Sequence, residues 1–173
     1  HDFNNWELDF LADYILNTHH KYVGEAMPML SEFSAKVAGV HGDSHPEVIE
    51  IARYFNAVAQ ELSMHMHKEE KILFPLIKKI AAAKRSGLPL PESHCGSVEG
   101  PIGVMEAEHI SAGENLARIK ELSNNYTPPQ DACSSYRVLF SNLQEFELDL
   151  HEHIHLENNI LFPKAIQMEK ELL

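Results

Sequence analysis

One pattern occurs twice in this chain, as HMHKEEKILFP at residues 65–75 and as HIHLENNILFP at residues 153–163. Both copies contain His-x-His-x-Glu followed by Leu-Phe-Pro at the same spacing. A histidine and a glutamate four residues apart share one face of an α-helix, because each residue turns the helix by about 100°. The repeat therefore predicts two related helices, each carrying a polar pair beside apolar residues.

The helical angles decide which histidine of the first copy points into the core. With His65 at 0°, Glu69 falls at about 40° and Leu76 at about 20°, on the same face. Ile72 falls at about −20° on that face, whereas His67 falls at about 200°, on the opposite face. We therefore expect His65 and Glu69 to be buried and His67 to face solvent.

The second copy repeats this arrangement, with His153 and Glu157 inward and His151 and His155 outward. A carboxylate and an imidazole are costly to bury unless they pair or bind a metal. One such pair is explained equally well as a hydrogen-bonded pair in the core. Two pairs bring two carboxylates together, and cations bridging them would remove their repulsion. The repeat therefore predicts a carboxylate-bridged dinuclear metal site in a helical bundle.

Further histidines suit such a site. His109 shares its helical face with apolar residues such as Met105, so it is expected to point inward. Near the N-terminus, His20 shares a face with Leu16, whereas His19 lies about 100° away. We therefore favour His20 over His19 as a ligand.

The composition limits the classes of function. The chain has 173 residues, 44% of them hydrophobic, which suits one globular domain with a substantial core. A net charge of −12 argues against nucleic acid and against a membrane as partners. The 12 histidines are unusually many, and histidine is the commonest transition-metal ligand. Cys95 and Cys133 form no CxxC motif, so we expect no disulfide framework and a cytoplasmic location.

The organisation is helical throughout. Long segments with helical periodicity are separated by clusters of Gly, Pro, Ser and Asn, and signals for strands are sparse. We expect an all-α fold, an antiparallel four-helix bundle, with the first helix bent at Pro28. The expected helices cover about residues 3–38, 46–85, 101–124 and 131–173, with a loop over residues 86–100 and a turn over residues 126–130.

This set of residues resembles the hemerythrin-like domain. The strings HMHKEEKILFP, GPIGVMEAEH and HEHIHLENNILFP resemble more narrowly the Repair of Iron Centers (RIC) family, and the similarity covers nearly the whole chain. That family comprises di-iron proteins linked to iron–sulfur cluster repair after nitrosative and oxidative stress. In it, five histidines and two bridging glutamates bind two irons. His41, by itself best interpreted as a surface histidine, becomes a ligand through this resemblance. The implied iron ligands here are His20, His41, His65, Glu69, His109, His153 and Glu157.

Two differences from oxygen-carrying hemerythrins argue against oxygen storage as the function. Those proteins place two histidines four residues apart on the third helix, whereas Met105 and Gly113 occupy the positions four residues from His109. Their last helix has an aspartate five residues after its histidine, whereas Glu157 follows His153 by four. The RIC family also commonly has an N-terminal Cys-bearing segment. We therefore expect residues 1–173 to be the C-terminal hemerythrin-like domain of a longer chain.

The resemblance implies a non-haem di-iron centre, with an oxo or hydroxo bridge, that supplies iron to damaged iron–sulfur proteins. We favour such an iron donor over a turnover enzyme. One alternative is reversible binding or sensing of oxygen or nitric oxide, which predicts a stable adduct without iron loss. A second is reduction of nitric oxide or peroxide, which predicts turnover with an electron donor. A third is a structural bundle that binds no metal. A homodimer is also compatible with the sequence.

Other residues near the repeats have simpler interpretations. Glu61 and Glu108 are candidates for contacts to the metal ligands, although ordinary solvated glutamates are the simpler interpretation. Pro75 and Pro163 each follow a conspicuous glutamate by six residues. They predict a bend or a weakening of each helix just past the site.

Overall fold

The structure is a computed structural model that describes residues 1–90, 92–93 and 96–173. The described residues form helices and no strands, which confirms the prediction of an all-α fold. Cys95 lies outside the described residues, and Cys133 is a free, exposed thiol. Within the described part, no helix has both the length and the apolar character that a membrane crossing requires.

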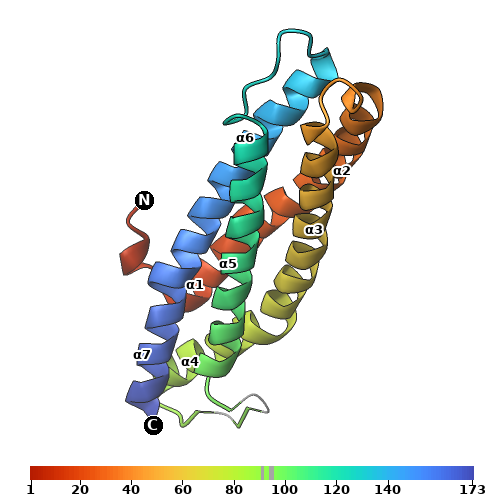
Figure 1. The fold of residues 1–173 in the computed structure, drawn as a ribbon. Helices are drawn as coiled ribbons and strands as arrows, with labels where there is room; N and C mark the ends of the chain where they lie inside the picture. The colour runs from red at the N-terminus through yellow and green to blue at the C-terminus, as the bar shows by residue number, and fades with distance from the viewer. Residues whose placement is uncertain (91, 94–95) are drawn as a thin grey trace. The chain divides into compact units, whose positions relative to one another are not determined.

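All four expected helices are present in the described residues, and three of them contain one π-helical turn. They can be followed in Figure 1 by colour, from red for α1 to blue for α7. The first consists of α1 (Leu8–Ile15), η2 (Leu16–His20) and α2 (Lys21–His41), after a short 3-10 turn, η1 (Phe3–Asn5). The second consists of α3 (Glu47–Lys68), η3 (Glu69–Leu73) and α4 (Phe74–Ser86). The third is α5 (Glu99–Leu122), and the fourth consists of α6 (Ser134–Leu156), η4 (Glu157–Leu161) and α7 (Phe162–Leu172).

Local sequence explains several helix ends. Gly87 ends α4 in the left-handed conformation, with φ of 65°, which glycine adopts without strain. Pro46 directly precedes Glu47, the first residue of α3, and its fixed φ suits a helix start. The Ser97 side chain accepts a hydrogen bond from the backbone N–H of Glu99, with 3.2 Å between Oγ and N, and so caps the start of α5.

The chain folds into two compact units, and each contains segments of all four helices. In unit 1, α4 packs against α1 and α7 around a buried apolar cluster that includes Leu11, Ile77 and Leu161. In unit 2, the buried rings of Phe55 and Phe146 meet edge to face, with centroids 5.5 Å apart. Unit 1 comprises residues 1–21, 64–109 and 151–173, and unit 2 comprises residues 22–63 and 110–150.

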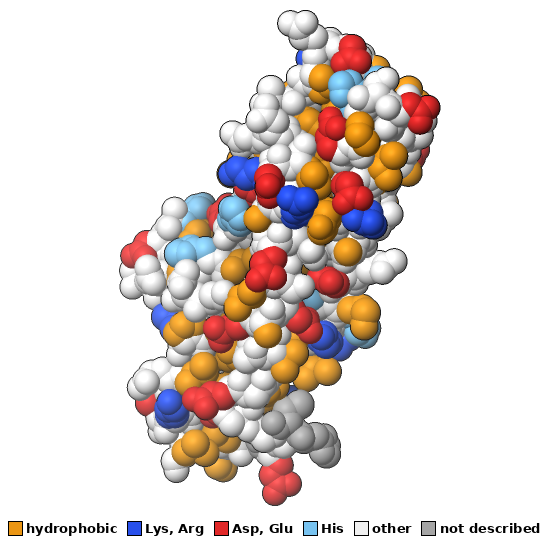
Figure 2. Space-filling model, viewed as in Figure 1, with side chains coloured by type: hydrophobic (Ala, Val, Ile, Leu, Met, Phe, Trp, Pro, Cys, Tyr) orange, Lys and Arg blue, Asp and Glu red, His pale blue; other side chains and the backbone are white. Residues whose placement is uncertain are grey.

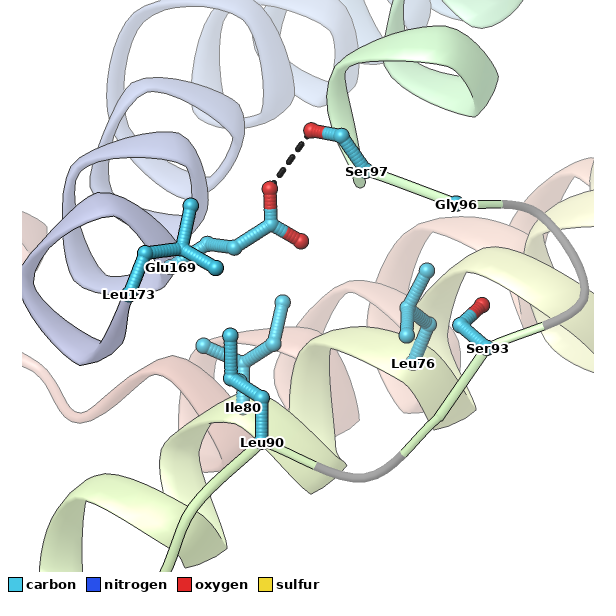
Figure 3. A pocket seen from close by; sticks show the side chains of 8 residues that line it. All are labelled: Leu76, Ile80, Leu90, Ser93, Gly96, Ser97, Glu169 and Leu173. Carbon is cyan, nitrogen blue, oxygen red and sulfur yellow. Dashed lines mark hydrogen bonds between the residues drawn. The ribbon is translucent and has the colours of Figure 1, made fainter.

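The surface is acidic, and Figure 2 shows Asp and Glu side chains spread over the face in view, as a net charge of −12 leads one to expect. Unit 1 also contains a cavity of about 230 Å³, lined mainly by apolar side chains (Figure 3). At its edge, the carboxylate of Glu169 accepts hydrogen bonds from Ser97 Oγ at 2.6 Å and from Val98 N at 2.9 Å. Both oxygens are bonded, so Glu169 fastens α7 to the start of α5.

Candidate metal centre

Six of the seven expected ligands lie in unit 1, each on one of the helices that the repeat and its partners predict. All six side chains are buried, with no residue more than 5% exposed. The outward histidines of the repeat, His67, His151 and His155, are exposed, which confirms that the first histidine of each copy is the one that points inward. The buried six are His20, His65, Glu69, His109, His153 and Glu157.

Three of the six sit in π-helical turns. His20 is the last residue of η2, Glu69 the first of η3 and Glu157 the first of η4. In η3 and η4 the residue after the turn, Phe74 or Phe162, donates its backbone N–H to the carbonyl of the glutamate five residues earlier. Such turns are uncommon and occur frequently at functional sites.

The Phe-Pro pair explains where two of these turns form. Pro75 and Pro163 have no N–H to donate, and a proline ring inside a helix collides with the carbonyl four residues earlier. The expected weakening of each helix thus takes the form of a π turn that ends just before Phe74 or Phe162. The turn that carries each glutamate is therefore set by the Leu-Phe-Pro motif.

The six side chains form two overlapping groups, each able to hold one metal ion. In each group, one donor atom per residue lies within 4.8 Å of the others. Glu69 and Glu157 belong to both groups, as expected for carboxylates shared between two metal positions. His20 and His153 complete the first group, and His65 and His109 complete the second.

The histidines turn Nε2 toward these carboxylates. His65 Nε2 lies 2.6 Å from Glu69 Oε1, and His109 Nε2 lies 2.9 Å from Glu157 Oε2. His153 Nε2 lies 2.8 Å from Glu157 Oε1. His20 Nε2 is farther away, at 3.7 Å from Glu69 Oε1 and 3.9 Å from Glu157 Oε1.

Several of these buried atoms make no well-aligned hydrogen bond with any described residue, although some lie close to an oppositely charged group. They are both oxygens of Glu69, Oε2 of Glu157, both ring nitrogens of His20 and Nδ1 of His153. Leaving such an atom unsatisfied costs about 1–3 kcal/mol, and more for a charged group. The donor set of imidazoles and carboxylates therefore fits a bound cation, which would satisfy these atoms together.

The carboxylates also change the protonation of the histidines in the metal-free chain. Burial lowers the pKa of His20, but Glu157 and Glu69 outweigh it and raise the pKa to about 9. The same carboxylates outweigh burial at His65 and raise its pKa. Burial raises the pKa of Glu157, yet His153, Glu69 and His109 together hold that pKa well below its ordinary value. Without metal, the protonated form of His20 is therefore favoured beside the buried carboxylates.

Two of the expected ligands have further partners on the ring nitrogen that faces away from the carboxylates. His65 Nδ1 lies 2.9 Å from Glu108 Oε1, and Lys68 Nζ donates to the other oxygen of Glu108. His109 Nδ1 lies 2.9 Å from Asn158 Oδ1. The simpler interpretation of Glu108 as an ordinary solvated glutamate is therefore wrong. Sequence reasoning missed Asn158, whose one available signal is its position directly after Glu157.

Neither group of metal-capable residues among those that the structure describes includes His41. His41 ends α2, a continuous helix of 21 residues that begins immediately after His20. His41 lies in unit 2, where its Nε2 is 3.2 Å from Cys133 Sγ. Glu61, also in unit 2, accepts a hydrogen bond from Ser111 at 3.2 Å.

Comparisons with known proteins agree with this centre. The sequence model of the family described as "Hemerythrin HHE cation binding domain" matches residues 11–165. The iron-sulfur cluster repair protein YtfE of Yersinia pseudotuberculosis serotype O:1b is 40% identical over 172 residues, which is 98% of this chain and 72% of that protein. The YtfE protein of Yersinia pestis strain Pestoides F is 39% identical over the same shares. The chain therefore belongs to the hemerythrin HHE cation-binding family, together with these iron–sulfur cluster repair proteins.

Proposed function

We propose that this chain holds two iron ions in the buried His/Glu centre and supplies iron to damaged iron–sulfur clusters. One observation carries the proposal: six buried side chains direct donor atoms to common points, and several of those atoms make no well-aligned hydrogen bond with any described residue. The names of the relatives support supply of iron to damaged clusters as the function, because both relatives are iron–sulfur cluster repair proteins.

The donor set is compatible with iron. Imidazole nitrogens and carboxylate oxygens suit a metal of intermediate softness, whereas thiolates, which favour softer ions, are absent from both groups. Each group supplies two histidines and a share in two carboxylates. That is fewer ligands than an octahedral ion takes, so small molecules or an acceptor have room to bind.

The protonation of the centre supports reversible loading. Without metal, His20 holds a proton at neutral pH, because its pKa is raised to about 9. Loading must displace this proton, and unloading lets His20 take it back. The buried carboxylates Glu69 and Glu157 are then never left without a positive neighbour.

The test combines iron content with iron transfer. We expect about two irons per chain by elemental analysis, and reduced iron in Glu69→Leu and Glu157→Leu. The loaded chain, carrying an iron isotope, is then mixed with an iron–sulfur enzyme inactivated by nitric oxide. Recovery of enzyme activity with the isotope in its cluster supports the proposal. A stable nitric oxide adduct that keeps its iron would favour gas binding, and turnover with an electron donor would favour reduction.

A further inference from the structure

We infer that the two metal positions are unequal, and that the position between His20 and His153 loses its ion first. The inference rests on the proposed function, since it assigns the iron that is passed on to one of the two groups. The other position, between His65 and His109, is then the resident one. Glu108 and Asn158 are the positioning residues that create the difference.

In the resident pair, His65 and His109, a hydrogen bond holds the ring nitrogen of each histidine that faces away from the metal position. His65 Nδ1 is hydrogen-bonded to Glu108 Oε1 and His109 Nδ1 to Asn158 Oδ1, each at 2.9 Å. Lys68 holds Glu108 in turn. A partner on the distal nitrogen fixes the tautomer and the orientation of the ring, and it makes the metal-facing nitrogen a better donor. Both histidines of this position are therefore set for tight binding.

The other pair has no such anchor. Nδ1 of His20 and Nδ1 of His153 make no hydrogen bond with any described residue. The nearest acid to His20 Nδ1 is Glu70, at 3.8 Å and with 38% of its side chain exposed. Ring packing holds these imidazoles instead: His20 stacks on Phe74 at 5.5 Å and His153 on His19 at 5.6 Å.

The distances to the shared carboxylates also indicate weaker binding at the position between His20 and His153. His20 Nε2 is 3.7 Å from its nearer carboxylate oxygen, whereas His65 Nε2 is 2.6 Å from Glu69. His20 is thus the ligand that stands farthest from the shared oxygens. An ion between His20 and His153 gains less from this chain than one between His65 and His109.

The experiment measures how fast iron leaves. The chain is loaded with ferrous ion without oxygen, its iron content is measured, and an excess of a coloured ferrous chelator is added. We expect two phases of equal amplitude. Glu108→Ala and Asn158→Ala should speed the slow phase by about 10- to 100-fold and leave the fast phase within about twofold. The matched control Glu70→Ala, which removes the unbonded acid, should leave the slow phase unchanged.

Single-ligand variants assign the phases. His20→Ala should keep one ion that leaves at the slow rate, and His109→Ala should keep one that leaves at the fast rate. Glu108→Gln, which keeps the size of the side chain, guards against a general loss of structure. If the wild type binds fewer than two ions, the proposed function fails. If two ions bind but leave in one phase, or if Glu108→Ala speeds the fast phase, this inference alone is overturned.

Discussion

The buried centre and the histidines at the end of α2 use similar residues to different effect. In the centre, four imidazoles and two carboxylates are buried and several donor atoms are unsatisfied within the described chain. At the end of α2, His45 Nε2 lies 2.9 Å from Asp131 Oδ1, and His41 Nε2 lies 3.2 Å from Cys133 Sγ. These partly exposed histidines already have partners, and they belong to neither group of metal-capable residues. Burial without internal partners, more than residue type, distinguishes a metal site.

The largest expected effect separates the two histidines within one copy of the repeat. His153→Ala removes a buried ligand, so it should lose about one iron per chain, whereas the exposed neighbour His155→Ala should keep both. Elemental analysis of iron beside a protein assay measures this. Equal iron loss in the two variants would break the distinction between buried and exposed histidines.

Metal binding at the buried centre should also change the stability of the folded chain. Binding to the folded state alone stabilises a chain by about 4 kcal/mol when the free ion is at about 1,000 times its dissociation constant. We expect ferrous ion to raise the melting temperature of the wild type, and a chelator to reverse the rise. The shift should be nearly abolished in a Glu69→Leu, Glu157→Leu double variant. A rise of the same size in that variant would mean that the stabilising ion binds elsewhere.

The stability of the metal-free chain should decrease as the pH rises. Because its folded pKa of about 9 exceeds the ordinary 6.5, protonated His20 adds stability that is complete below pH 6.5. This contribution, on the order of 3 kcal/mol, should be lost as pH rises through about 9. Thermal unfolding of the metal-free chain between pH 6 and 10 measures it. His20→Gln should flatten the dependence, and an unchanged slope would count against a charged His20.

The smallest expected effect is at His41. The family resemblance predicts an iron ligand there, whereas the structure places His41 at the far end of α2 with Cys133 as a neighbour. From the structure we expect His41→Ala to keep two irons and to change stability by less than about 1 kcal/mol. Loss of one iron in this variant would show that His41 reaches the centre, and the contrast between the two regions would fail.

Helical periodicity in the sequence was sufficient to predict which side chains of the repeat point into the core. The 100° rule placed His65, Glu69, His153 and Glu157 inward because long helices keep their phase over several turns. The preference for His20 over His19 rested on shared faces alone. His20 belongs to a metal-capable group, although both side chains are buried.

Other features depend on contacts that periodicity cannot describe. Ile72 was expected to point inward, yet it is 48% exposed, while its counterpart Ile160 packs into the core of unit 1. The two lie at the same position of equivalent π turns, so the neighbouring elements decide the outcome. The bond between Asn158 and His109 joins two helices, and no pattern along a single helix predicts such a contact.

The π turns also determine which changes in length such a chain can accept. A π turn contains one residue more than an α-helical turn, and the helix after it keeps the phase of a regular helix that is one residue shorter. Deleting one residue between Glu69 and Phe74 would therefore give a regular helix and leave the apolar face of α4 turned toward α1 and α7, against which it packs. In a regular helix of unchanged length, that face would be turned away by about 100°. The fold should therefore tolerate a single-residue deletion in this turn better than a single-residue insertion.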